Sequence, residues 1–273
     1  MKQILRVALM VLLAAVLGVG SAWGEKKEYT DGNGITWEYE EIEAGATCSI
    51  GIPKSNRGSI SGFVKIPRTV VVRGVSISVV EIGNSAFEGC SSLTGVSISD
   101  GVTKIGAGAF SRCSGMTAVT IPDGVTRIGG YAFYGCSGLK EVTIPGSVTV
   151  IEWWAFYGCS GLKEVTITGS VTKIGRNAFN GCSGLKSIAV ESGNERYCSE
   201  QGVLFTKGKD TLVCYPGGKP EGSYSIPSSV TAIGDGAFAN CSGLTAVTIP
   251  ESVTEIGGLG ISILQRVDGG DYS

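Results

Sequence analysis

The sequence contains no histidine among its 273 residues. This absence excludes Ser-His-Asp and Cys-His catalysis, and it excludes the zinc sites that depend on imidazole ligands. Nine cysteines are present, but no two of them have the C-x-x-C spacing of a thiolate zinc site. We therefore expect no metal and no other cofactor.

The sequence also has no large excess of either positive or negative charge. The chain has 22 basic and 24 acidic residues, a net charge of -2, and no long run of either sign. A protein that binds nucleic acid needs a basic surface to meet the phosphates. The composition therefore argues against a nucleic-acid partner.

Long apolar runs are limited to the N-terminus. Lys2 and Arg6 precede an apolar stretch from Val7 to Val19, which is shorter than the ~20 residues of a membrane-spanning helix. Ala22-Trp23-Gly24 fits the small-x-small rule for cleavage, so we predict a signal peptide over residues 1–24 rather than an uncleaved anchor. Charges or glycines interrupt every later apolar run. The mature protein is expected to be secreted or held at the cell surface, without stable membrane insertion.

Glycine, in contrast, is abundant, with 43 residues, and many of them fall at regular places in a repeated phrase. The phrase is I-G-x-x-A-F-x-G-C-S-x-L-x-x-V-x-I-P-x-x-V-T-x, and it recurs every 23 residues. Its first isoleucine falls at Ile82, Ile105, Ile128, Ile151 and Ile174, and again at Ile233 and Ile256. A fixed period of this size is typical of a solenoid, in which each coil buries its apolar side against its neighbours.

One coil of the repeat can be followed from residue 139 onward. In Leu139–Pro145 the spacing L-x-x-V-x-I points three apolar side chains inward and the residues between them outward, as on a half-buried strand. The proline ends this strand, and Val148–Ile151 forms a second short extended piece. We expect Ala155, Phe156 and Cys159 to point inward from one helical turn.

The phrase closely resembles the BspA-like leucine-rich repeat, also called the Treponema pallidum type. Val102–Cys113 followed by Met116–Pro122 carries nearly every marker position, and the resemblance covers roughly Ser61 to Gly257. It implies a right-handed solenoid found on bacterial surfaces or in secretions, and in some parasitic eukaryotes. It also implies a non-catalytic adhesin for host matrix or plasma proteins, or a mediator of contact between bacteria.

The predicted fold is a β-rich α/β solenoid: a right-handed leucine-rich-repeat stack with a parallel β-sheet face, short helical turns, an N-terminal β cap and a β-hairpin insert. The cap is predicted from a turn at Asp31–Gly34 and the alternating strand that follows it. The acidic turn does not fit a calcium-binding EF-hand loop, because Ile35 and Ile42 occupy positions five and twelve, where the loop needs oxygen ligands. The hairpin rests on Val203–Phe205 and Thr211–Val213. The segments are a signal peptide (1–24), a β cap (25–60), solenoid (61–190), a hairpin insert (191–222), solenoid continued (223–258) and an irregular tail (259–273).

The cysteines of an exported protein invite a disulfide framework. Six of them occupy one repeat position, at Cys90, Cys113, Cys136, Cys159, Cys182 and Cys241. Parallel side chains on successive coils disfavour the twist of a disulfide, so we expect a buried row that is mostly reduced. Cys198 and Cys214 in the insert form the candidate disulfide, and Cys48 stays unassigned.

The candidate binding residues lie where the phrase changes to aromatic residues in two consecutive coils. These residues are Tyr131, Tyr134, Trp153, Trp154 and Tyr157. Outward positions of a solenoid are free to recognise a ligand, and exposed aromatic side chains suit protein or carbohydrate recognition. The alternative is that these rings only pack against each other or against a neighbouring coil.

Three other features suggest different functions. Ser97, Thr120, Thr143, Thr166 and Thr248 form a hydroxyl row on the strand face, which suits lateral assembly or the ordering of ice as well as strand packing. Glu141 and Glu164 fall on neighbouring strands at about the spacing of a retaining glycosidase. Gly106-Ala107-Gly108 and Gly234-Asp235-Gly236 resemble a dinucleotide loop, but no βαβ unit surrounds them.

The sequence thus predicts an exported, monomeric and non-catalytic module for protein interaction or adhesion. Its expected partners are extracellular proteins or glycans. An assembly-forming solenoid and a carboxylate-based enzyme remain the alternatives.

Overall fold

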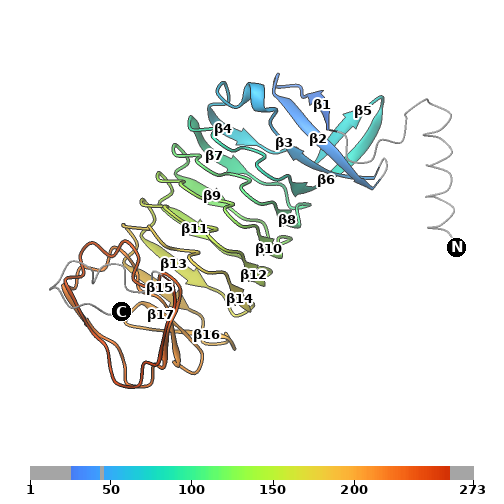
Figure 1. Cartoon of the computed structure of the whole chain (residues 1–273). Helices are drawn as coiled ribbons and strands as arrows, with labels where there is room; N and C mark the ends of the chain where they lie inside the picture. Colours follow the sequence, from blue (N-terminus) through green and yellow to red (C-terminus); the bar gives the residue numbers. More distant parts are fainter. Residues whose placement is uncertain (1–25, 44–45, 259–273) are drawn as a thin grey trace, which may run out of the picture.

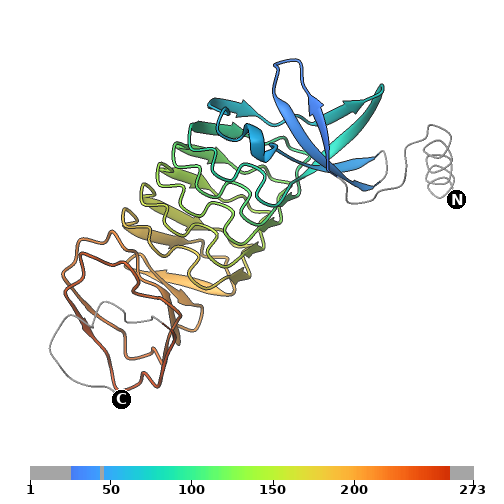
Figure 2. The same ribbon diagram turned by 45° about the horizontal axis from the view of Figure 1, so that its top comes forward.

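The computed structural model describes residues 26–43 and 46–258. The predicted signal peptide and the tail from residue 259 lie outside these residues. Figures 1 and 2 show an elongated stack of coils, with a β-rich cap at the end where the described chain begins. Over the described ranges, no helix has the length and apolar character to cross a bilayer.

The cap is continuous with the solenoid. Its strands are β1 (Lys27–Thr30), β2 (Thr36–Glu43), β3 (Thr47–Gly51), β5 (Thr69–Val72) and β6 (Val75–Ile82). β1, β2 and β3 pair antiparallel, and β3 then pairs parallel with β6, whose last residues begin the first coil. The apolar end of the first coil is therefore covered by a sheet that shares its hydrogen-bond ladder.

Trp37 is the side chain that closes this end. It is fully buried, and its ring meets Phe87 of the first coil edge-on at 6.2 Å between centroids. The Nε1 atom of Trp37 donates to Oδ2 of Asp31 at 3.0 Å, while Oδ1 accepts from the backbone N–H groups of Asn33 and Ile35. The acidic turn thus orients the tryptophan of the cap.

Each coil presents a strand face and a short-strand face. The strand face carries β4 (Gly62–Lys65), β7 (Leu93–Ser97), β9 (Ala118–Thr120), β11 (Glu141–Thr143), β13 (Glu164–Ile167), β15 (Ser187–Val190), β19 (Ser223–Ser225) and β21 (Ala246–Thr248). The second face carries β8 (Lys104–Ile105), β10 (Arg127–Ile128), β12 (Val150–Ile151) and β14 (Lys173–Ile174). Ile105, Ile128, Ile151 and Ile174 are partners in successive parallel pairs, so the register follows the 23-residue period (Figure 1).

The third side of the coil, which we call the turn face, corrects one prediction. The Ala-Phe segments are not helical, and the only helix of the described residues is a three-residue 3-10 turn, η1 (Lys54–Asn56), near the cap. In the third coil, short turns close from Ala132 N to the Gly129 carbonyl, while Phe133 N donates to Ala155 of the next coil at 2.7 Å. Because the N–H groups that a helix would use are given to the next coil, the described fold is an all-β solenoid, and the α/β assignment was wrong.

The core is a column of repeated side chains. Phe87, Phe110, Phe133, Phe156 and Phe179 stack along the axis with centroids 5.1 to 5.6 Å apart and planes within 14° of parallel. Most residues at the Ile, Ala, Cys, Leu and Val positions of the phrase are buried around them, whereas Ile249 and Ile256, near the end of the described chain, are exposed. The coil repeat is therefore close to the ~4.8 Å spacing of paired strands.

The six cysteines of the phrase form a buried row of free thiols. From Cys113 onward, each thiol of the row donates to a backbone carbonyl of the preceding coil; Cys113 Sγ donates to Phe87 and Cys136 Sγ to Phe110, both at 3.0 Å. Burial raises the pKa of Cys90 to about 11 and that of Cys136 and Cys241 to about 12. At neutral pH these groups are protonated, weakly reactive packing elements.

This burial predicts a large difference in thiol reactivity between the folded and unfolded protein. At pH 8, a thiol reagent such as DTNB should titrate about one cysteine of the folded chain, the partly exposed Cys198, because the other cysteines are buried out of reach of the reagent. In denaturant without reductant, all nine cysteines should react. A denatured, unreduced sample with no free thiols would contradict the buried reduced row.

The insert rebuilds a coil rather than adding a separate unit. β16 (Tyr197–Glu200), β17 (Val203–Thr206) and β18 (Thr211–Cys214) pair antiparallel, so the hairpin is present. β18 then pairs parallel with β20 (Ala232–Ile233), and β20 pairs with β22 (Glu255–Ile256). Tyr215 follows β18 in the place of a core phenylalanine, because its carbonyl accepts from Cys241 Sγ and its ring lies 5.4 Å from Phe238.

The proposed disulfide between Cys198 and Cys214 was wrong. Cys198 on β16 stands opposite Phe205, and Cys214 on β18 stands opposite Leu204. With β17 between them, their backbones are about 9.6 Å apart at the ~4.8 Å strand spacing, beyond the ~7 Å reach of a disulfide. Both thiols are free, and Cys198 Sγ donates to the carbonyl of Thr206 at 3.1 Å.

Candidate functional site

The five aromatic side chains singled out in the sequence form one cluster on the turn face. The ring of Tyr131 lies at its centre, 4.6 Å from Trp153, 4.8 Å from Trp154 and 5.5 Å from Tyr134. Tyr134 and Tyr157 are parallel within 7° at 5.2 Å, the geometry of an offset stack. The rings pack against each other and still remain partly exposed; Trp153 is 44% exposed.

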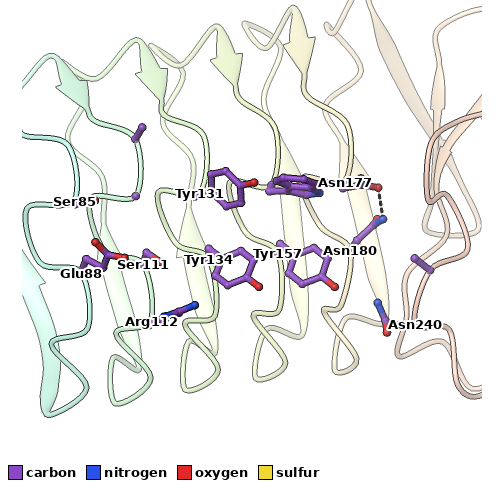
Figure 3. Close-up of a pocket in the computed structure, with 14 residues that line it drawn as sticks. Ser85, Glu88, Ser111, Arg112, Tyr131, Tyr134, Tyr157, Asn177, Asn180 and Asn240 are labelled. Atoms are coloured by element: carbon purple, nitrogen blue, oxygen red, sulfur yellow. Dashed lines mark hydrogen bonds between the residues drawn. The ribbon is translucent and has the colours of Figure 1, made fainter. Parts of the chain in front are cut away.

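The cluster stands in the middle of a hollow of about 720 Å³. Tyr131, Tyr134, Trp154 and Tyr157 line it, whereas Trp153 packs behind Tyr131 and is not part of its lining. The remaining lining residues are Ser85, Glu88, Ala107, Gly108, Ser111, Arg112, Asn177, Asn180, Ala239 and Asn240. We call this hollow the turn-face groove, since it runs along the solenoid across successive coils (Figure 3).

Two rows of repeat positions form the groove. The first row is the position after I-G-x, and its members in the groove are Ser85, Gly108, Tyr131, Trp154 and Asn177; Gly236 has the same repeat position but does not line the groove. The second row follows A-F and consists of Glu88, Ser111, Tyr134, Tyr157, Asn180 and Ala239. Figure 3 shows the labelled members of each row side by side across the coils. The groove is therefore polar at both ends and aromatic in the middle.

The first row has an unusual backbone. Tyr131 and Trp154 adopt φ of 57° and 56°, in the left-handed region where the equivalent residues of the other coils, Ser85, Gly108, Asn177 and Gly236, also lie. That region costs a bulky residue roughly 1 to 2 kcal/mol relative to glycine. The tyrosine and the tryptophan thus occupy sites that suit glycine or asparagine, and such strain commonly marks a functional position.

Asparagine side chains hold the far end of the groove in place. The Nδ2 atom of Asn180, a buried residue, donates to the Gly236 carbonyl at 2.9 Å and also to Oδ1 of Asn177. This bond joins the coil before the insert to the coil after it, because the rebuilt coil between them has a shorter turn. Arg176 and Asp235 form an ion pair at 3.9 Å beside it.

The groove carries little net charge. Glu88 and Arg112 are its only charged lining residues, one of each sign. Glu88 is paired with Arg57 at 3.5 Å, and Arg112 is exposed. The groove therefore presents hydroxyl, amide and aromatic groups rather than a field of one sign.

Comparison with known proteins places this fold in a family. The model of the BspA type leucine rich repeat region matches residues 76–200 and 221–260, in six copies. The chain belongs to the BspA-type leucine-rich-repeat family. No curated protein matches it.

Solved structures share the BspA-type solenoid. A leucine rich cell surface protein from Faecalibacterium prausnitzii is 28% identical with a TM-score of 0.61, over 86% of this chain and 74% of that one. The T. pallidum leucine rich repeat protein is 25% identical with a TM-score of 0.54, over 90% and 99%. The pneumococcal vaccine antigen PcpA, 23% identical with a TM-score of 0.68 over 85% and 66%, shares the fold.

The aromatic members of the groove were found from sequence, but its polar members were missed. Ser85, Ser111, Asn177, Asn180 and Asn240 look like ordinary variable positions of the BspA-type repeat. A signal was present, since Asn177 is one period after Trp154 and Asn180 is one period after Tyr157. Both rows are therefore present in the sequence as columns of equivalent repeat positions.

The other candidate surfaces of the BspA-type solenoid have simple geometry. Thr120 pairs with Ser97 on one side and Thr143 on the other, so the hydroxyl row lies on consecutive strands. Glu141 and Glu164 are both exposed, in a hollow of about 610 Å³ that Lys140 and Lys163 also line. In the part of the chain that the structure describes, no three His, Cys, Asp or Glu side chains gather to hold a metal.

The glycine-rich segments are part of the scaffold. Gly106 N donates to the Ile82 carbonyl at 2.9 Å, and Gly108 N donates to the Gly130 carbonyl at 2.8 Å. A phosphate-binding loop needs free N–H groups that point at the ligand. Because these groups are committed to the coil ladder, the dinucleotide interpretation has no structural support.

Proposed function

We propose that this protein is a non-catalytic binding module that holds an extracellular protein or glycan in the turn-face groove. The observation that carries the proposal is the placement of Tyr131 and Trp154 at left-handed positions, where they remain partly exposed beside the groove. Their conformation costs stability, whereas neighbouring coils use glycine or asparagine there. A recognition role accounts for that cost.

The separation of core positions from groove positions within the repeat supports the same proposal. Most of the recurring apolar residues of the phrase are buried in the core, whereas residues that differ between coils line the groove. Aromatic residues grouped beside polar ones are the usual source of binding energy at recognition sites. Hydrolysis through Glu141 and Glu164 is not favoured, because both carboxylates are exposed to solvent in their hollow and lack the buried environment of a catalytic carboxylic acid.

We place this module at the cell surface or in the secretions of a cell. The N-terminal pattern predicts export, and a leucine rich cell surface protein is among the similar structures. Adhesion, either to a host or to a neighbouring cell, is the role that fits such a location.

The test is an array of glycans and extracellular matrix proteins probed with the mature protein and with Trp153→Ala/Trp154→Ala. We expect at least one ligand whose affinity falls about tenfold or more in the double variant, because buried aromatic contacts dominate recognition. Phe63→Ala is the matched control, since Phe63 is 68% exposed and lies outside the groove. Unchanged adhesion by the double variant would contradict the proposal.

A further inference from the structure

The groove has the form of a site for a linear ligand. It extends from Ser85 to Asn240, and its aromatic centre repeats at the coil spacing, as the 5.2 Å between Tyr134 and Tyr157 shows. A ligand that contacts both polar ends must lie along the solenoid axis, over several coils (Figure 3). A chain of similar units suits this arrangement better than a globular partner, which needs a broad surface of about 800 Å².

The backbone of the groove is not available to an extended peptide. A bound peptide strand draws its affinity from main-chain hydrogen bonds to an unpaired edge. Here Ser85 N donates to Ala107, Tyr131 N to Trp153 and Trp154 N to Arg176, each within the ladder between coils. Only side chains are left to bind a ligand on this face.

Those side chains suit a polyhydroxylated ligand without charge. The tyrosine and serine hydroxyls and the asparagine amides can each donate and accept, which matches hydroxyl groups that do the same. The offset stack of Tyr134 and Tyr157 leaves part of each ring face uncovered for apolar C–H groups. The lining has a single anion, Glu88, which is paired with Arg57, and a single cation, Arg112, so it has no cluster of like charges that would favour an acidic or a basic polymer.

We infer that the turn-face groove binds a neutral linear oligosaccharide, with sugar rings against the tyrosines and Trp154 and hydroxyl groups against Ser111, Asn177 and Asn240. This inference rests on the proposed binding function and names its ligand class. The first-row strain belongs to the same site, since Tyr131 and Trp154, the bulkiest of the residues that bear it, line its centre.

The experiment is calorimetry of the mature protein with cello-, manno-, xylo- and chito-hexaose. We expect at least one hexasaccharide to bind, with affinity that increases from the disaccharide to the hexasaccharide because more coils are contacted. The affinity should change less than twofold between 50 and 500 mM NaCl, since no charge is involved. Heparin and a proline-rich peptide serve as the charged and peptidic comparisons.

The chain supplies its own variants for this test. In the double variant Tyr131→Gly/Trp154→Asn, the first substitution copies Gly108 of the preceding coil and the second copies Asn177 of the following coil. We expect the hexasaccharide affinity to fall at least tenfold while the melting temperature is unchanged or higher, because the left-handed backbone is relieved. A merely structural aromatic cluster would instead lower the melting temperature.

The outcomes separate this inference from the proposed function. If no hexasaccharide binds, or if binding survives in Tyr131→Gly/Trp154→Asn, the oligosaccharide assignment is overturned. If heparin or the peptide binds in its place, or a protein on the array binds through Trp153 and Trp154, the assignment fails while the binding function stands. If neither the array nor the hexasaccharides give a ligand that depends on the groove, both fail.

Discussion

Replacement of Gly175 by alanine is expected to destabilise the protein by about 3 kcal/mol or more. A Cβ atom on Gly175 would lie 2.2 Å from the backbone nitrogen of Trp153 and 2.5 Å from the carbonyl carbon of Glu152. Both are main-chain atoms of the preceding coil, so no rotamer change can relieve the overlap. The coils must separate locally, and Gly175 N would then lose its 2.8 Å bond to Ile151. Urea unfolding followed by circular dichroism measures the loss.

Gly146→Ala is the matched control for this prediction. Nothing lies within 4 Å of a Cβ atom on Gly146, and its φ is not in the left-handed region. We expect its free energy of unfolding to stay within about 0.5 kcal/mol of the wild type. Equal stability of the two variants would mean that the coils are not in the close contact described here.

Replacement of Phe133 by alanine is the second change with a large expected effect, about 3 to 5 kcal/mol. Phe133 is fully buried and stacks on Phe110 at 5.4 Å and on Phe156 at 5.1 Å. Removal of the ring leaves a cavity in the centre of the aromatic column and breaks two stacking contacts. Because a coil contacts only its neighbours, the two halves of the solenoid should then unfold in separate steps.

The control for Phe133 is the next residue of the same coil. Tyr134→Ala removes a partly exposed ring at the groove, so its effect on stability should be less than half as large. Thermal unfolding of both variants, followed by circular dichroism and by tryptophan fluorescence, tests the prediction. A single cooperative transition in Phe133→Ala, at the wild-type midpoint, would contradict it.

The repeat register was predictable because burial and strand pairing obey the same period. An isoleucine recurs every 23 residues at Ile105, Ile128 and Ile151. A solenoid can bury all of these side chains only if equivalent residues of successive coils are stacked. The inward direction of the phenylalanines and cysteines follows from that stacking. These parts of the fold follow from the repeated sequence pattern alone.

The helical turns were predicted wrongly because the sequence pattern does not distinguish a helical turn from a compact non-helical turn. An inward Ala-Phe pair fits one turn of helix as well as a compact turn, since both place two apolar residues on the same side. The choice depends on the acceptor of the Phe133 N–H, which is Ala155 of the next coil. That acceptor is 22 residues away and is available only once two coils are stacked.

The insert shows the same limit. Its hairpin could be read from Val203–Phe205 and Thr211–Val213, but its return to the solenoid could not. Tyr215 takes the place of a core phenylalanine, but it lies two residues nearer to the start of its coil than the phenylalanines of the other coils do. The turn of this coil is therefore shorter, and Asn180 of the coil before it contacts Gly236 of the coil after it. The predicted disulfide failed because the order of three strands, and not the distance along the chain, separates Cys198 from Cys214.

The sequence by itself determined the 23-residue period, the composition of the core and the coils in which aromatic residues replace small ones. The tertiary structure alone decided that the turn face is an all-β ladder and that Tyr131 and Trp154 adopt left-handed backbone. It also decided that the variable positions of six coils form one groove. The physical reason is that a periodic pattern specifies which residues are equivalent, whereas hydrogen bonds and ring contacts between coils decide what those residues do together.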